Sequence, residues 1–129
     1  MPFLDLFTLT LLVALFQILH CFEEIGMNAY LLLEKRCPKN PRGAYLRVAT
    51  VLVTLNFAVI FLLLYGAPFA PYLCIYTVYI SLVNCFVHLY GWYKTKAYMG
   101  TLGAGVFSGI PLGIAGAALL YVLLTRYVL

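Results

Sequence analysis

Four long apolar segments divide the chain, and they constrain its fold more than any other feature of the sequence. Each is long enough to cross a hydrocarbon core of about 30 Å as a helix rising about 1.5 Å per residue. We expect these helices at residues 6–33, 44–65, 72–93 and 101–126. The connections between them are short, which favours antiparallel neighbours. The sequence therefore predicts an all-α, polytopic integral membrane protein, with one domain over residues 1–129 built as an up-down antiparallel four-helix bundle.

Composition agrees with a membrane protein and argues against a soluble domain. Hydrophobic residues make up 65% and charged residues 9% of the chain, whereas soluble chains average about 45–50% and about 25%. The formal net charge of +4 could attract nucleic acid, but the basic residues gather in two connections between apolar segments. We therefore expect the lipid bilayer as the surrounding medium and no nucleic-acid partner.

The distribution of lysine and arginine predicts an orientation in the membrane. Loops with an excess of these residues stay in the cytoplasm. The first and third connections carry this excess, so we expect both basic loops to be cytoplasmic and both termini to lie outside. The residues on the basic side are Lys35, Arg36, Lys39, Arg42, Arg47, Lys94 and Lys96, which leaves Arg126 for the other side.

Three ionisable residues, His20, Glu23 and Glu24, interrupt the first apolar segment. A continuous helix would place Glu24 about 16 Å from Lys35, near the middle of the hydrocarbon. An ionised carboxylate at that depth costs at least about 2.5–3.5 kcal/mol. We therefore expect these acids to be protonated, or to be held by a cation or by hydrogen-bonding partners.

Helical periodicity adds polar companions to this cluster. One face of the first segment is polar, and the third segment carries a second polar stripe at a matching depth below its basic loop. We therefore expect the two stripes to face each other across the bundle. They consist of Gln17, His20, Glu24 and Asn28, flanked by Glu23, and of Thr77, Ser81, Asn84 and His88.

The residue types suggest a role for each member of the stripes. Imidazole and carboxylate groups suit zinc or non-haem iron, so we expect a single divalent metal as cofactor. The expected ligands are His20, Glu23, Glu24 and His88. Catalysis is assigned to Glu23, Glu24 and Asn84, and a substrate pocket to Gln17, Asn28, Thr77 and Ser81.

The second and fourth segments leave two questions open. Thr50 and Thr54 share one face of the second segment and Asn56 lies on another, and only one of these faces can look into the bundle. The fourth segment carries glycine at every fourth position, a pattern that permits close helix approach in lipid. We expect this face to be a packing seam, within the chain or in a homodimer. It consists of Gly105, Gly109 and Gly113.

The string His20-Cys21-Phe22-Glu23-Glu24 resembles the motif of a family of small bacterial membrane proteins named for His-x-x-Glu-Glu. A later Asn-x-x-x-His of the family pattern is matched by Asn84-Cys85-Phe86-Val87-His88. Met99 stands where that pattern has proline. The resemblance covers most of the chain. It implies metal binding or catalysis at the motif and a bacterial-type cytoplasmic (inner) membrane, without naming a reaction. Three further positions also fit: Gly100, Thr101 and Pro111.

Three functional hypotheses account for acids inside the membrane. The first is a metal-dependent enzyme acting on a lipid or another hydrophobic substrate. The second is a metal-free acid–base enzyme, such as a lipid or isoprenoid isomerase, in which glutamate and histidine exchange one proton. The third is a proton or cation carrier, because intramembrane acids and histidines also form relays. A purely structural protein would leave the acids unexplained, and we favour the first hypothesis.

Overall fold

A computed structural model describes residues 2–128 of the chain, with side chains from residue 6 to residue 127. All regular elements of the described part are helices, joined by turns and loops, and it contains no strand. Its elements are α1 (Pro2–Gly26), a 3₁₀ helix η1 (Ala29–Leu33), α2 (Pro41–Leu64), α3 (Ala70–Thr95), α4 (Val106–Leu123) and a π-helical turn η2 (Leu124–Val128). Within the described residues, 4 helices are long and apolar enough to span a membrane, as expected from the four apolar segments.

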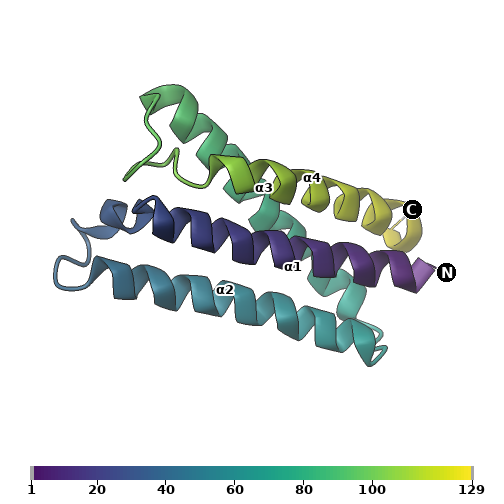
Figure 1. Cartoon of the computed structure of the whole chain (residues 1–129). Helices are drawn as coiled ribbons and strands as arrows, with labels where there is room; N and C mark the ends of the chain where they lie inside the picture. The colour runs from purple at the N-terminus through teal and green to yellow at the C-terminus, as the bar shows by residue number, and fades with distance from the viewer. Residues whose placement is uncertain (1, 129) are drawn as a thin grey trace.

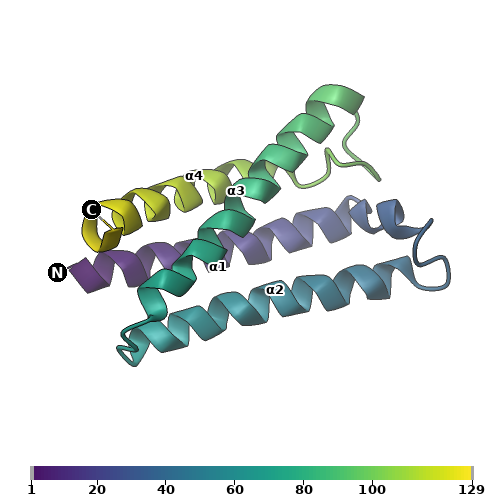
Figure 2. The same cartoon turned by 180° about the vertical axis from the view of Figure 1, so that it is seen from behind.

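The four helices pack unevenly. α4 packs against both α1 and α3, whereas α2 packs chiefly against α1 and touches α3 less. In Figures 1 and 2, α3 leans away from the other helices toward its C-terminal end. The two ends of the chain lie at one end of the molecule, and the loops that follow α1 and α3 lie at the other (Figure 1).

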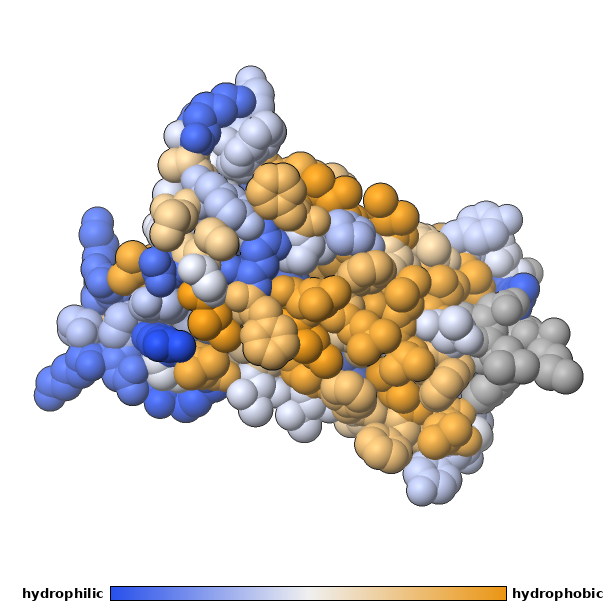
Figure 3. All heavy atoms as spheres, viewed as in Figure 1, coloured by the Kyte–Doolittle hydropathy of each residue, from blue (hydrophilic) through white to orange (hydrophobic). Residues whose placement is uncertain are grey.

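The apolar core occupies the end of the bundle near the chain termini. It is built from the beginnings of α1 and α3 and the ends of α2 and α4, and its members include Leu6, Leu63, Cys74 and Leu119. Apolar side chains also cover much of the outer surface, whereas hydrophilic side chains gather at the loop end (Figure 3). The loop end is therefore the part of the bundle in which polar groups replace the apolar core.

α1 is shorter than the first helix expected from the sequence, because it ends at Gly26 and not at Leu33. Asn28 adopts a left-handed conformation with φ 59°, which asparagine tolerates better than most residues, and η1 follows it. His20 lies six residues before Gly26, about 9 Å along the helix axis. The ionisable cluster therefore lies near the loop end of α1, and not near mid-helix as a continuous helix would have placed it.

α4 also differs from expectation, because it begins at Val106 and not at Thr101. Gly100 and Gly105 have φ values of 67° and 94°, which residues with a side chain rarely adopt. The chain before α4 is instead an irregular loop tied to the turn after α1, since the Gly100 N–H donates to the Met27 carbonyl at 2.7 Å. The ends of α2 and α3 lie within three residues of the expected ones.

Candidate metal centre

His20, Glu24 and His88 form a compact group between α1 and α3. Each contributes one possible ligand atom, and these atoms lie within 4.8 Å of one another. Glu24 stands between the two imidazoles: its Oε1 lies 3.2 Å from His88 Nε2 and its Oε2 lies 3.6 Å from His20 Nε2. The imidazole rings meet edge to face, with centroids 4.7 Å apart. The structure thus brings together the two polar stripes at the positions where histidine and glutamate were expected to meet.

The orientation of His88 is set by the loop before α4. Its Nδ1 lies 2.7 Å from the carbonyl oxygen of Leu102. A carbonyl only accepts, so Nδ1 carries a proton. Nε2 then faces Glu24, with a lone pair if the ring is neutral and with an N–H donor if the ring is an imidazolium. A backbone carbonyl that fixes the tautomer in this way is a common second partner of metal-binding histidines.

The orientation of His20 is set by α4 through Ser108. The hydroxyl of Ser108 donates its only proton to the Glu23 carboxylate, so its oxygen accepts from His20 Nδ1, 3.0 Å away. The Nε2 of His20 is therefore also directed toward Glu24. Among the described residues this atom has no hydrogen-bond partner, although the His20 side chain is 0% exposed.

The three residues fit a small divalent cation. Without one, the buried Nε2 of His20 has no hydrogen-bond partner among the described residues, and a buried polar atom without a partner costs free energy. A zinc ion with ligands at about 2.0–2.1 Å in tetrahedral geometry separates neighbouring donor atoms by about 3.3 Å. The separations of 3.2 and 3.6 Å, which involve different oxygens of Glu24, are close to that value, and all three ligand atoms lie within 4.8 Å of one another. The donor set of two imidazoles and one carboxylate is also one that zinc and non-haem iron accept.

Glu23 is not a member of this group, although the sequence suggested it as a ligand and a catalytic residue. Its side chain turns to the beginning of α4, where the backbone N–H groups of Phe107 and Ser108 donate to it at 3.2 and 2.7 Å. The hydroxyls of Ser108 and Tyr98 donate to it as well. Four donors match the four lone-pair sites of an ionised carboxylate, and a helix N-terminus favours negative charge. Glu23 thus anchors α4 and, through Ser108, orients His20.

The glycine face of α4 packs within the chain, and a homodimer through this face stays a prediction. A Cβ added at Gly105 would lie 2.7 Å from His20 Cε1, and one at Gly113 would lie 2.5 Å from Cys85 Sγ. Gly109 also faces His20 and Cys85, and all three glycines are buried. Their lack of side chains lets α4 approach α1 and α3 closely enough to place Ser108 beside His20.

The remaining expected site residues, which are Asn84 as a catalytic residue and four pocket residues, fall into two groups. Gln17 and Asn84 lie beside the centre, where the Asn84 amide donates to Gln17 Oε1 at 3.1 Å. Three others do not reach it. Asn28 lies beyond the end of α1 and accepts from Tyr30, Thr77 donates to Asn56 at 3.2 Å, and Ser81 donates to the Val78 carbonyl at 2.8 Å.

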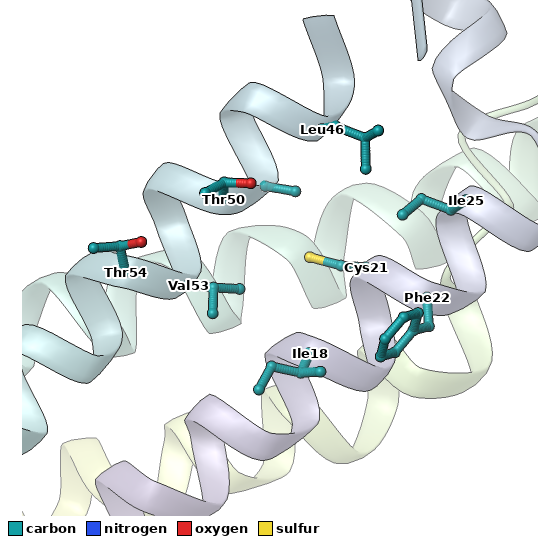
Figure 4. A pocket seen from close by; sticks show the side chains of 9 residues that line it. Ile18, Cys21, Phe22, Ile25, Leu46, Thr50, Val53 and Thr54 are labelled. Carbon is teal, nitrogen blue, oxygen red and sulfur yellow. The ribbon is translucent and has the colours of Figure 1, made fainter. Parts of the chain in front are cut away.

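The open question about α2 is resolved by burial. Asn56 is buried against α3, whereas Thr50 and Thr54 are exposed. The two threonines line a surface groove between α1 and α2 (Figure 4). The Asn56 face therefore looks into the bundle, but Asn56 bonds to Thr77 and not to the metal-ligand group.

Three contacts of the centre were missed by the sequence reasoning: Tyr45, Ser108 and the Leu102 carbonyl. The Tyr45 hydroxyl donates to Glu24 Oε2, although a tyrosine near a basic loop is more typical of the aromatic belt at the membrane surface. Ser108 stands beside the glycines of α4, and that position was its only signal. A backbone carbonyl carries no sequence signal at all.

Comparison with known proteins gives one family. The family model described as "Protein of unknown function with HXXEE motif" matches residues 11–115. The match includes the motif in α1 and all three residues of the metal-ligand group. No curated protein and no solved structure matches the chain.

Proposed function

This chain belongs to the HXXEE family of proteins of unknown function, and we propose that it is an integral membrane metalloenzyme acting on a lipid or another hydrophobic substrate. The proposed ligands of a single zinc or iron ion are His20, Glu24 and His88. One observation carries the proposal: the buried Nε2 of His20 has no hydrogen-bond partner among the described residues and is directed toward Glu24. A cation there would satisfy all three groups at once.

The chain's own residues would prepare the centre in three ways. Leu102 and Ser108 hold the imidazoles so that both Nε2 atoms face inward. The Tyr45 hydroxyl holds a proton beside Glu24, where it can be given to or taken from a bound group. Asn84, linked to Gln17, offers an amide near the same carboxylate. When bound, the metal would polarise an oxygen of the substrate as a Lewis acid.

The proposal includes a placement in the membrane. The helices would run up and down through a bacterial-type cytoplasmic membrane, with the basic loops in the cytoplasm and the termini outside. Since the metal-ligand group lies toward the loop end of α1, it would stand on the cytoplasmic side of the bilayer. A lipid could then present its polar end to the site while its chain stays in the hydrocarbon.

A second candidate, a metal-free acid–base enzyme, is favoured by the short distance between Glu24 and His88. Their facing atoms lie 3.2 Å apart, which is within reach of a single shared proton. Such a pair could move a proton along a hydrophobic substrate, as an isomerase does. It leaves the Nε2 of His20 without a partner, and for that reason we place it second.

Metal analysis of detergent-purified protein separates the two candidates. Protein expressed with zinc and with iron should carry near-stoichiometric metal, and His20→Ala, His88→Ala and Glu24→Gln should each reduce the metal content by about tenfold or more. Glu34→Gln is the matched control, because Glu34 is exposed in a loop. Folding is checked by circular dichroism and gel filtration. Folded wild-type protein without metal in either preparation would falsify the metal hypothesis and leave the acid–base candidate.

A further inference from the structure

A small cavity adjoins the metal-ligand group on the side of α2. It has a volume of about 170 Å³ and is enclosed by residues of α1, α2 and α3. Glu24 belongs to both the cavity and the metal-ligand group, whereas His20 and His88 do not line the cavity. A molecule in this space would therefore reach the centre at the Glu24 carboxylate.

The cavity has one polar wall. Gln17 and Asn84 are bonded to each other there, and the Tyr45 hydroxyl donates to Glu24. Gln17 lies in a membrane-spanning segment and is only 1% exposed. Polar groups without partners are costly in such a segment. Hydroxyl and amide groups gathered in this way can exchange hydrogen bonds with a polar group of a ligand.

The rest of the cavity is apolar and uncharged. Val48, Ala49 and Leu52 of α2 form the facing wall. Among the described residues, no lysine or arginine lines the cavity, so no side chain there balances the charge of a carboxylate or phosphate head. The lining thus favours a ligand with a neutral polar end and an apolar body.

The cavity lies where a membrane lipid can reach it. Val48 is 58% exposed and stands on the outer surface of a membrane-spanning helix. Asn84 of α3 lines the same cavity as Val48, and α3 leans away from α2 on the side of the basic loops (Figure 2). An amphiphile could therefore enter sideways from the bilayer between α2 and α3, with its chain remaining in lipid.

From these observations we infer that the cavity between α1, α2 and α3 binds the neutral head group, a hydroxyl or a carbonyl, of a long-chain amphiphile that enters between α2 and α3. Tyr45, Gln17 and Asn84 would hold the head group beside Glu24. The inference rests on the proposed function, because it names the substrate class of that same centre.

Photolabelling tests the inference directly. The probe is a long-chain primary alcohol with a diazirine next to its hydroxyl end, applied to the purified full chain in detergent. The label should map to the segments of α2 and α3 around Val48, Leu52 and Asn84. Unlabelled long-chain alcohol or ketone should compete with the probe, and an alkyl phosphate or a fatty acid should not. Labelling spread over all lipid-facing surfaces, or stronger competition by the charged amphiphiles, would overturn the inference.

Replacing each of two alanines of α2 with leucine provides a matched pair of variants. Ala49 lines the cavity, so Ala49→Leu should reduce labelling there by about tenfold, since the larger side chain would take up space that the head group needs. Ala58 is exposed on the same helix and lines a different groove, between α2 and the beginning of α3, and Ala58→Leu should keep the labelling of the cavity at the wild-type level. Equal labelling of both variants would contradict the inference. The map on the unmodified chain decides the question if Ala49→Leu fails to fold.

Metal content measured on the same samples distinguishes this inference from the proposed function. Protein that contains metal but is not labelled specifically would refute the head-group site and leave the metal hypothesis standing. Specific labelling without metal would refute the metal hypothesis and retain the cavity as the binding site of the acid–base candidate.

Discussion

Glu23 and Glu24 are neighbours in the chain, yet their carboxylates serve different helices. Glu23 accepts from the beginning of α4, whereas Glu24 accepts from Tyr45 of α2 and lies between two histidines. Successive residues on an α-helix point about 100° apart, so one pair of acids can face two sides of α1. The final two residues of the motif therefore have different roles. Glu23 anchors α4 and orients His20 through Ser108, whereas Glu24 belongs to the metal-ligand group.

Exchanging each acid for its amide should separate these roles. Glu23→Gln replaces one accepting oxygen with an NH₂ group that faces two of the donors. We expect this variant to lower the free energy of unfolding by about 2 kcal/mol and to keep part of the metal binding. Glu24→Gln removes a ligand oxygen, so metal should be lost first. Thermal unfolding in detergent and metal analysis give the two readouts. Equal effects of both variants on both readouts would refute the division of roles.

Ser108→Ala tests the link between Glu23 and His20. The variant keeps all three proposed ligands but removes the oxygen that accepts from His20 Nδ1. Loss of such an outer partner typically weakens metal binding by about 10–100-fold, and that is the expected decrease in affinity. Titration of the metal-free protein with zinc measures it. Ser108→Thr retains a hydroxyl and should bind nearly as the wild type does. An unchanged affinity in Ser108→Ala would show that the hydrogen bond does not position His20.

Gly105→Ala should disturb the centre without removing any polar group. Gly105 has φ 94°, and an added Cβ would meet His20 Cε1 at 2.7 Å and Glu24 Cγ at 3.0 Å. The conformation alone costs about 1–2 kcal/mol for a residue with a Cβ, and α4 must also move away from α1. We expect a lower unfolding temperature together with weaker metal binding.

Gly66→Ala is the matched control for strain, because Gly66 also has a positive φ, at 69°, but no atom lies within 4 Å of its added Cβ. It should lose stability and keep its metal affinity. A Gly105→Ala protein that binds metal as tightly as Gly66→Ala would contradict the close-packing explanation.

Alkaline pH should weaken the anchor at Glu23 through Tyr98. Burial, and next the hydrogen bond to Glu23, raise the pKa of Tyr98 above its ordinary value of 10.0. The unfolded chain therefore loses this proton at a lower pH than the folded one. The stabilisation is fully present below pH 10 and is lost as the pH rises through the folded pKa. Unfolding measured between neutral pH and pH 11 should show the loss, and Tyr98→Phe should reduce its steepness. An identical slope in the variant would exclude Tyr98 as the cause.

The helices and the pairing of His20 with His88 were predictable because they depend on simple periodicities. Apolar length gave four spanning helices, and a 3.6-residue period brought Glu24 and His88 to facing surfaces. Depth counted from the basic loops put Asn84 level with Glu24 and His88 level with Asn28, whereas in the structure Asn84 bonds to Gln17 and His88 lies beside Glu24. The helices and the facing surfaces follow from the average geometry of a straight helix, which the sequence expresses directly.

The features that were missed depend on local breaks in that geometry. The left-handed Asn28 ends the regular helix early, so residues beyond it lose the phase that a continuous helix would give them. The loop before α4 brings Leu102 and Ser108 to the histidines through positive-φ glycines, and sequence spacing does not reveal such a path. Glu23 could not be told from Glu24 until the position of α4 was known.

The early end of α1 at Gly26 also determines which compartment can supply the centre. Glu24 stands two residues from that end, so an ion dissolved in the water at the basic loops is separated from the carboxylate by a short distance. From the opposite compartment, the same ion would have to cross the apolar core around Leu6, Leu63 and Leu119. The metal ion should therefore be loaded, exchanged and removed by a chelator only from the side of the basic loops. The occupancy of the centre would then depend on the metal concentration in that one compartment.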